Sequence, residues 1–235
     1  MKKVLLIIPA YNEEECILNT YNKVLKYDYD VIVINDGSTD NTKVICEENN
    51  IPVINLINNL GIGGAMQTGY KYAYQKGYDI AVQFDADGQH NVEYVDNLIQ
   101  PIINEEIDAV IGSRFIKVDK ENFLSTKSRR VGIKIISLAI KLRTKYKIYD
   151  TTSGFRAVNK KVIELFAKNY PSEYPEPITN MILIKEKYKV KEISVRMNER
   201  ESGVSSIRKL KSIYYMINVL FSILLVEYKG GSINE

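Results

Sequence analysis

Two carboxylates, Asp85 and Asp87, follow a short apolar run and are the residues of this chain whose types and spacing most clearly suggest chemistry. The run, Ile80 to Phe84, is typical of a buried strand, and Gly88 supplies a tight turn directly after the pair. Both carboxylates should therefore project from the carboxyl end of a strand. Mg2+ or Mn2+ takes oxygen ligands of this kind together with substrate phosphates, and Gln89 could add a neutral oxygen. Asp-x-Asp-Gly is also ordinary turn chemistry, so the motif alone leaves both interpretations open.

The composition fits one domain, or one domain with a small appendage, because 45% of the 235 residues are hydrophobic. Cys16 and Cys46 have no metal-binding or redox spacing, and the single histidine, His90, excludes a zinc site built on several imidazoles. The apolar run Val4 to Ile8 is too short for the hydrophobic region of a signal peptide and is followed by Pro9. We therefore expect free thiols and a cytoplasmic protein.

The formal net charge of +3 conceals an uneven distribution. Residues 114–147 contain eleven Lys or Arg against two acidic residues, a local balance of +9, so the remainder of the chain carries −6. Such a basic block indicates a phosphate, an anionic membrane surface or a nucleic acid as partner. Because the block contains no recognisable nucleic-acid-binding module, we expect no nucleic-acid partner.

The first half of the chain alternates short β-branched runs with helical patterns. Strands are expected at residues 4–8, 31–35, 53–56, 80–84 and 109–112, and helices at 13–27, 41–49, 63–75 and 92–104. This alternation predicts an α/β fold, with a Rossmann-like, mostly parallel sheet flanked by helices. Further helices are expected at 129–149, 160–168 and 178–188, and another strand at 190–195.

Four consecutive strand ends carry polar or turn residues, and in such sheets ligands bind outside the carboxyl ends of the strands. The loops therefore predict a crevice the size of a nucleotide. In the second loop, the carboxylate of Asp36 could accept a hydrogen bond from a base. In the third, Gly61, Gly63 and Gly64 would let a ligand approach the backbone and open a helix whose amides favour an anion. A purely structural helix-entry turn explains these glycines equally well.

The end of the chain predicts an amphipathic helix within residues 205–228. The apolar stretch from Ile213 to Val226 would span about 21 Å as a helix, short of the roughly 30 Å of a bilayer core, so we expect no membrane crossing. A thin polar stripe leaves most of the circumference apolar; it comprises Lys211, Tyr215, Asn218 and Ser222. The apolar part should face a membrane surface, which we favour, or another subunit, as in a homodimer or a complex with a membrane protein.

Six segments in order resemble the inverting family 2 glycosyltransferases with the GT-A fold, in particular the branch of dolichol-phosphate mannose synthases and bacterial polyprenyl-phosphate sugar transferases. They are Pro9-Ala-Tyr-Asn-Glu-Glu, Asn35-Asp-Gly-Ser-Thr-Asp, Asn59-Leu-Gly-Ile-Gly-Gly-Ala, Asp85-Ala-Asp-Gly-Gln-His, Gly112-Ser-Arg-Phe and Ser153-Gly-Phe-Arg. The resemblance covers nearly the whole chain. It implies a nucleotide-sugar donor and a metal-dependent, inverting transfer.

The resemblance also assigns roles to individual residues. The donor would contact Pro9, Tyr11, Glu13, Asp36, Gly63 and Ala86, and Asp85, Asp87 and Gln89 would hold Mg2+ or Mn2+ on its diphosphate. The metal would neutralise the charge that builds on the leaving nucleoside diphosphate. Arg114 and Arg129 or Arg130 match the arginines that bind the acceptor's phosphate. Arg200 and Ser205 resemble a late loop that closes over the donor diphosphate.

The chain departs from the glycan-elongating members of the family near residue 176. Those members carry a Glu-Asp pair whose Asp deprotonates an acceptor hydroxyl, whereas this chain reads Tyr174-Pro-Glu-Pro-Ile-Thr-Asn. Glu176 lies at the offset expected of that base, so Asp87 and Glu176 are the candidate catalytic residues. A cap on the following helix is the alternative role for Glu176. A phosphate acceptor is already ionised and needs no base.

The leading hypothesis is an enzyme peripheral to the cytoplasmic face of a membrane, which moves a sugar from a nucleotide-sugar to a polyprenyl phosphate or to a cell-surface glycan. We expect a catalytic domain at residues 1–204, with a donor-binding half at 1–113 and an acceptor-binding half at 114–204, and the amphipathic helix at 205–235. A nucleotidyltransferase should show a glycine-rich loop with Arg and Lys after the first strand, where this chain has Pro9-Ala-Tyr-Asn. A noncatalytic, membrane-associated protein that binds nucleotide-sugars is the remaining alternative.

Overall fold

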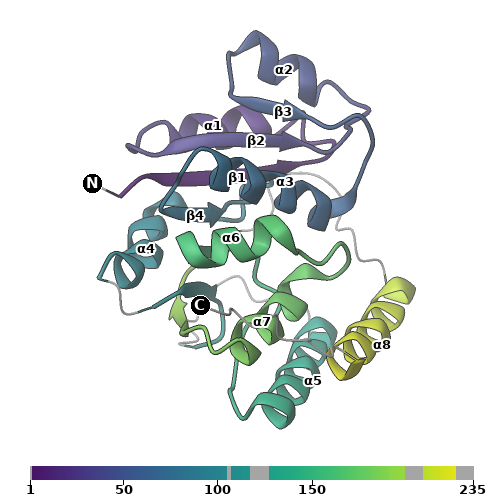
Figure 1. Cartoon of the computed structure of the whole chain (residues 1–235). Helices are drawn as coiled ribbons and strands as arrows, with labels where there is room; N and C mark the ends of the chain where they lie inside the picture. The colour runs from purple at the N-terminus through teal and green to yellow at the C-terminus, as the bar shows by residue number, and fades with distance from the viewer. Residues whose placement is uncertain (1, 105–106, 117–126, 199–208, 226–235) are drawn as a thin grey trace.

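A seven-stranded sheet forms the centre of the computed structural model, which describes residues 2–104, 107–116, 127–198 and 209–225 (Figure 1). The strand order is β3-β2-β1-β4-β6-β5-β7. The strands are β1 (Val4–Ala10), β2 (Asp30–Asn35), β3 (Val53–Asn55), β4 (Ile80–Gln83), β5 (Ala109–Ser113), β6 (Arg156–Asn159) and β7 (Val190–Ser194). Only β6 runs antiparallel to its neighbours, so the described sheet is mostly parallel, as the sequence predicted.

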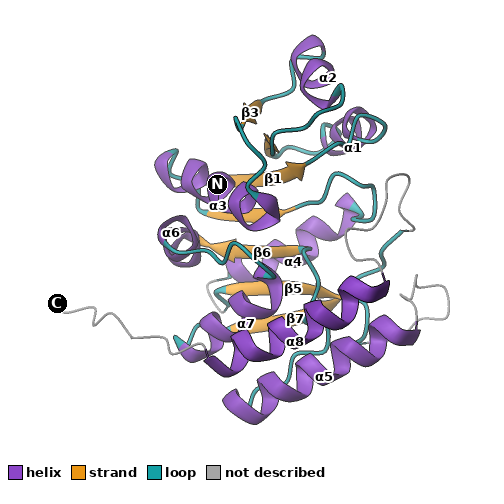
Figure 2. Ribbon diagram, turned by 90° about the vertical axis from the view of Figure 1, so that its right-hand side faces the viewer, coloured by secondary structure: helices purple, strands orange, loops and turns teal. Residues whose placement is uncertain are grey.

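Helices cover both faces of the sheet (Figure 2). They are α1 (Ile17–Val24), α2 (Thr42–Glu48), α3 (Gly61–Gln75), α4 (Val95–Ile103), α5 (Lys127–Thr144), α6 (Lys160–Lys168), α7 (Pro175–Lys185) and α8 (Lys209–Leu225), with a 3-10 turn, η1 (Val92–Tyr94), before α4. Because side chains alternate along β1, neighbouring residues of this strand pack against helices on opposite faces of the sheet. Leu6 and Ile8 pack with α1 and α4, whereas Leu5 and Ile7 pack with α3 and α6.

The prediction missed β6 altogether. Only Ala157 and Val158 of its four residues are apolar, and the strand begins with Arg156, which is buried. Several helix ends also differ from the prediction, for example those of α1, and two of the differences have a clear physical reason. The helix expected at 178–188 begins at Pro175, because proline suits the first turn of a helix, and the helix expected at 129–149 stops at Thr144, because Lys145 takes a positive φ of 62°.

The loops after β1 and β2 are joined by hydrogen bonds at the carboxyl edge of the sheet. The Asn12 N–H donates to Ser38 Oγ at 3.0 Å, and the Thr39 N–H donates to Asn12 Oδ1 at 2.8 Å. Gly37 has a φ of +65°, and a Cβ there would lie 2.7 Å from the backbone nitrogen of Asn59. The second and third loops are therefore in backbone contact, and glycine is required at the point where they meet.

A separate apolar cluster lies at the end of the molecule remote from β3. It joins α5, α7 and α8 through Ile136, Ile140, Met181, Val219 and Ile223. Both halves of the expected catalytic domain contribute to one sheet, since β6 lies between β4 and β5. Over the residues that the structure describes, no helix is long and apolar enough to span a membrane.

Candidate active site

The loop that carries Asp85 and Asp87 follows β4 and is held from two sides. From α1, the Thr20 hydroxyl donates a buried hydrogen bond of 2.7 Å to the carbonyl of Ala86. From the residues after β7, the Asn198 N–H donates to the Gln89 carbonyl at 2.9 Å. Within the loop, Asp87 Oδ1 accepts from the Gln89 N–H at 3.0 Å. The loop therefore has a defined shape before any ligand binds.

Asp85 lies in a hydrogen-bonding environment that the sequence motifs did not reveal. Its backbone N–H donates to Nδ1 of His90 at 2.9 Å, so the proton of the neutral imidazole resides on Nε2, 3.5 Å from Asp85 Oδ2. The His90 ring stacks on Phe155 with 4.6 Å between centroids. The Gln83 amide donates to Asp85 Oδ1 at 3.2 Å. His90 and Gln83 thus orient one of the candidate metal ligands.

The donor set fits a hard divalent cation. Asp85 and Asp87 offer carboxylate oxygens and Gln89 an amide oxygen, and in the described part of the chain no three His, Cys, Asp or Glu side chains converge as a metal-binding group. Two carboxylates suit Mg2+ or Mn2+, which complete their shells with substrate phosphates and water. Zinc sites built from cysteine and several histidines would need ligands that this loop lacks.

Gly154 keeps the space beside these groups open. A Cβ at this position would lie 2.6 Å from the Gln83 amide nitrogen and 3.1 Å from Asp85 Oδ2. Gly154 belongs to the Ser153-Gly-Phe-Arg segment that precedes β6, so the missed strand brings it to the site. The absence of a side chain here leaves the Asp85 carboxylate free to turn toward a ligand.

Gly154→Ala should therefore lower the rate of the expected sugar transfer by about one to two orders of magnitude, because Gln83 and Asp85 must shift by a few tenths of an ångström or more. The protein should stay folded. The measurement is a comparison of turnover and thermal unfolding for the wild type and the variant. Gly77→Ala is a suitable control for the unfolding measurement, because a Cβ at Gly77 meets no atom within 4 Å although its φ of +72° is strained. Full turnover by Gly154→Ala would show that the space is not needed.

Glu176 lies in the first turn of α7 and joins the same network. Burial raises the pKa of its carboxyl, and the charge of Asp85 adds to the rise, whereas Arg156 and hydrogen bonds from Gln83 and from its own N–H oppose it. Gln83 therefore donates to both Asp85 and Glu176. Glu176 is half-buried, and a carboxyl with a raised pKa at this place could accept a proton from a substrate; its bond to the α7 backbone also supports the capping role.

Arg156 is buried, and its charge acts on Glu176. Its Nη1 donates to Thr179 Oγ1 at 2.7 Å and its Nη2 to the Ser153 carbonyl at 2.6 Å, while its Nε is buried and has no hydrogen-bond partner among the described residues. The hydroxyls of Tyr70 and Tyr170, whose rings lie 5.3 Å apart, are likewise buried and find no partner in the part of the chain that the structure describes. Buried polar atoms of this kind are normally satisfied by ordered water or a ligand.

Arg114 is buried and forms an ion pair with Asp150. Its Nε and Nη2 donate to the two carboxylate oxygens of Asp150 at 2.7 and 2.8 Å, and its backbone N–H adds a third bond at 3.2 Å. Asp150 has no exposed surface, and its own N–H donates to Glu192. The guanidinium thus forms a bidentate ion pair within the protein, and its predicted contact with an acceptor phosphate stays a prediction.

The other predicted acceptor residues are only partly covered by the structure. Arg129 and Arg130 lie in the first turn of α5, where Arg129 is exposed and Arg130 is half-buried. Arg200 and Ser205 lie outside the described residues. Within the described part of the chain, the predicted acceptor residues are therefore Arg129 and Arg130 on α5 and the buried Arg114.

The predicted donor residues gather at the ends of β1, β2 and α3. Pro9 is buried in β1, Tyr11 is exposed, and the half-buried Glu13 begins the turn that leads into α1. Asp36 is buried, and its Oδ1 accepts from the Leu60 N–H at 2.7 Å. Burial raises the pKa of Asp36, and the amides of the third loop oppose the rise. Asp36 thus connects the second loop to the start of α3.

Gly63 has a structural reason for lacking a side chain. A Cβ there would lie 2.2 Å from the carbonyl oxygen of Pro171, so α3 can approach the segment before α7 only through glycine. This contact supports the structural interpretation of the glycine cluster at this position. Its predicted contact with the donor stays a prediction.

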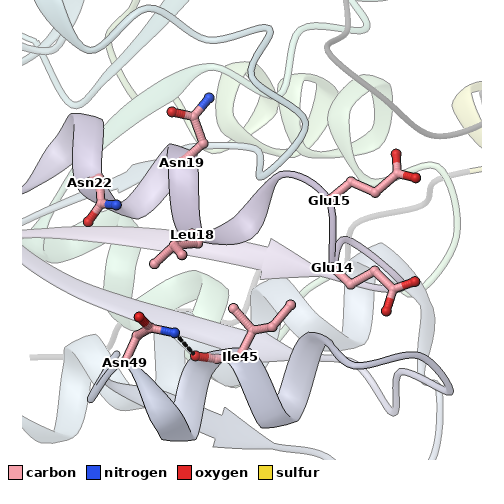
Figure 3. Close-up of a pocket in the computed structure, with 7 residues that line it drawn as sticks. All are labelled: Glu14, Glu15, Leu18, Asn19, Asn22, Ile45 and Asn49. Carbon is pink, nitrogen blue, oxygen red and sulfur yellow. Dashed lines mark hydrogen bonds between the residues drawn. The ribbon is translucent and has the colours of Figure 1, made fainter.

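A shallow groove between α1 and α2 lies apart from these residues (Figure 3). It is lined by Glu14, Glu15, Leu18, Asn19, Asn22, Ile45 and Asn49. None of the predicted donor, metal or acceptor residues lines it. The Asp85 loop, which contains the predicted metal ligands, therefore stays the candidate active site.

The sheet order and the acidic loop after β4 define an α/β protein of the glycosyltransferase GT-A type. Residues 5–166 match the model of "Glycosyl transferase family 2", and the chain belongs to this family, as its motifs predicted. The UDP-N-acetylglucosamine–dolichyl-phosphate N-acetylglucosaminyltransferase of Methanococcus voltae is 37% identical over 207 residues, which cover 80% of this chain and 82% of the relative. The dolichol-phosphate mannosyltransferase of Pyrococcus furiosus is 32% identical, over 97% of this chain and 65% of the relative.

A solved structure confirms the fold. Glucosyl-3-phosphoglycerate synthase from Mycobacterium tuberculosis, crystallised with Mn2+, uridine diphosphate and phosphoglyceric acid, superimposes with a TM-score of 0.71. The match covers 97% of this chain and 81% of the synthase, at 18% sequence identity. The protein is therefore a family 2 glycosyltransferase with a GT-A fold.

Proposed function

We propose that this glycosyltransferase moves a sugar from a nucleoside-diphosphate donor to a polyprenyl phosphate, with inversion at the sugar and with the help of a divalent metal. The observation that carries the proposal is the preformed Asp85 to Gln89 loop, whose two carboxylates follow β4 at the carboxyl edge of the sheet. The relatives named above act, by their names, on dolichyl or dolichol phosphate. A third relative is named an undecaprenyl-phosphate mannosyltransferase.

The metal ligands would be Asp85, Asp87 and Gln89, and a bound Mg2+ or Mn2+ would neutralise charge on the donor diphosphate. A solved neighbour crystallised with Mn2+ and uridine diphosphate supports the use of a divalent metal. The loops after β1 and β2, including Tyr11 and Asp36, would hold the nucleoside. Hydrogen bonds between these loops would position the donor before the acceptor arrives.

The transfer would be a single displacement. An acceptor phosphate oxygen attacks the anomeric carbon on the face opposite the diphosphate, and its electron pair forms the new carbon–oxygen bond. The bond between the anomeric carbon and the diphosphate breaks, and its electron pair leaves with the nucleoside diphosphate. A phosphate monoester is already largely ionised at neutral pH, since its second pKa is about 6. No general base is then required, and Glu176 would position Gln83 and Asp85 rather than accept a proton.

The acceptor class can be tested with a panel of nucleotide-sugars and Mn2+, incubated with a short-chain polyprenyl phosphate, the matching free polyprenol, or an oligosaccharide. The proposal expects a sugar on the polyprenyl phosphate and none on the free polyprenol. Transfer only to the oligosaccharide would overturn the acceptor assignment. Donor binding without transfer to any acceptor would favour the noncatalytic alternative.

Glu176→Gln separates the two roles of this residue. With polyprenyl phosphate as acceptor, we expect the variant to keep at least about a tenth of the wild-type rate, whereas loss of a required base typically costs about a hundredfold or more. A hundredfold loss with the phosphate acceptor would contradict the positioning role.

The same variant should show a pH-dependent difference in stability. Because the pKa of Glu176 is raised in the folded protein, the folded state holds its proton more tightly, and wild-type stability falls as pH rises from the ordinary value of 4.5 through the raised one. Glutamine mimics the protonated form, so Glu176→Gln should melt a few degrees higher than the wild type at neutral pH. The difference in melting temperature between the variant and the wild type should disappear near pH 4.5. A difference that grows toward acid pH would contradict the raised pKa of Glu176.

A further inference from the structure

Helix α5 has apolar residues on two opposite sides. Ile133, Ile136 and Ile140 are buried against the protein, as expected for a core-facing stripe. A second stripe faces away from them and comprises Val131, Ile135, Leu138 and Leu142, with exposed fractions of 57%, 40%, 55% and 76%. Surface helices normally carry polar residues on the side opposite the core. The outer stripe of α5 therefore has no role in the fold that the structure describes.

Helix α8 repeats this arrangement beside α5. Val219 and Ile223 are buried, whereas Ile217, Phe221 and Leu224 are 47%, 58% and 57% exposed and lie one turn apart. The two helices run side by side at the end of the molecule remote from α2 (Figures 1 and 2). They are closely packed: a Cβ at Gly132 would lie 2.4 Å from the sulfur of Met216, and Arg143 donates to the carbonyl of Leu224. The outer stripes thus lie on two neighbouring, packed helices, and we call their exposed apolar residues together the α5/α8 surface.

Charge indicates what covers the α5/α8 surface. The sequences of α5 and α8 contain no acidic residue, and Lys134 and Lys141 are exposed beside the outer stripe of α5. A second copy of the chain, related by a two-fold axis, would bring these lysines toward their own counterparts. An anionic bilayer instead offers hydrocarbon for the apolar stripes and negative headgroups for the lysines, the combination that stable surface binding needs.

We propose that the α5/α8 surface docks on an anionic lipid bilayer, with the outer stripes in the headgroup region and Lys134 and Lys141 against the lipid phosphates. Helix α7 packs against both α5 and α8 and carries Glu176 at its first turn. Docking would therefore hold the candidate active site one helix away from the membrane. Vesicle binding by this surface does not depend on the acceptor proposed above, so the two proposals can fail separately.

Sedimentation with vesicles tests the docking surface. The full chain should bind vesicles of phosphatidylcholine with about 30% phosphatidylglycerol, and bind pure phosphatidylcholine more weakly. Leu138→Glu with Leu142→Glu should reduce binding to the anionic vesicles about tenfold or more, and Lys134→Glu with Lys141→Glu should remove the preference for anionic lipid. Turnover with a water-soluble, short-chain acceptor should stay near wild type in both variants.

Leu25→Glu is the matched control, because Leu25 is 56% exposed, close to the 55% of Leu138, and follows α1 on another part of the molecule. This variant should bind vesicles as the wild type does. Equal binding by the wild type and the Leu138/Leu142 variant would overturn the proposal. A wild-type dimer in solution that these substitutions dissociate, with no vesicle binding, would overturn it in favour of a second copy.

Discussion

Replacing Asp87 with alanine is expected to lower the rate of sugar transfer by about a thousandfold or more, the largest effect that we expect of any single substitution. Asp87 is buried in a loop whose backbone is anchored by Thr20 and Asn198, so the loop holds its carboxylate in a defined place. Without it, the candidate metal would lose one of two carboxylates, and charge on the departing diphosphate would be poorly neutralised. The measurement is turnover with saturating Mn2+.

A folding defect can be distinguished from a catalytic one. Asp87→Asn keeps the shape of the side chain and an oxygen that can accept from the Gln89 N–H, so it should unfold near the wild-type temperature and still be inactive. Asp28→Ala, which removes a carboxylate from the turn between α1 and β2, should leave turnover unchanged. An Asp87→Ala protein with more than half of the wild-type activity would exclude this residue from the metal site.

Asp150→Leu should destabilise the protein by about 3–5 kcal/mol, because it leaves the buried guanidinium of Arg114 without its counter-ion. Arg114→Met should have a cost of similar size, since it leaves the Asp150 carboxylate uncompensated. The double variant Arg114→Met with Asp150→Leu removes both charges and should recover most of the loss. Urea unfolding of the three variants measures these differences, and the coupling between the two positions should be well above 1 kcal/mol in magnitude.

A further variant, Arg114→Lys, distinguishes the two possible roles of Arg114. If the guanidinium serves mainly to hold Asp150 and the end of β5, Arg114→Lys should lose stability and use donor and acceptor less well to a similar degree. If Arg114 binds the acceptor phosphate, as the family resemblance implied, Arg114→Lys should keep its stability and raise only the KM for the acceptor. The bidentate pair in the structure favours the first result.

The sequence predicted most of the sheet because its β-branched runs and glycine-containing turns are local signals. It could not predict β6, since that strand begins with Arg156, whose burial and hydrogen bond to Thr179 depend on the tertiary fold. The ion pair between Arg114 and Asp150 joins residues 36 positions apart, so spacing carried no sign of it.

In the candidate site, too, some residues have a local signal in the sequence, whereas others are recognised only from contacts in the folded protein. The position of Asp85 and Asp87 at a strand end predicts a metal site, and the family resemblance predicts a role for Glu176 from its offset along the chain. Gln83 was taken as part of a buried strand, although its amide donates to both Asp85 and Glu176. A glutamine inside an otherwise apolar strand, two residues before an acidic pair, is the signal that could have identified it.

The central claim is that the Asp85 loop binds the donor diphosphate through a divalent metal, and calorimetric titration of the wild-type protein with uridine diphosphate and guanosine diphosphate tests it most directly. With Mn2+ present, at least one of the two nucleotides should bind about a hundredfold more tightly than in EDTA. Asp87→Asn should abolish that difference while it stays folded. Equal affinity of the wild type with Mn2+ and with EDTA, or an undiminished metal effect in Asp87→Asn, would contradict the account.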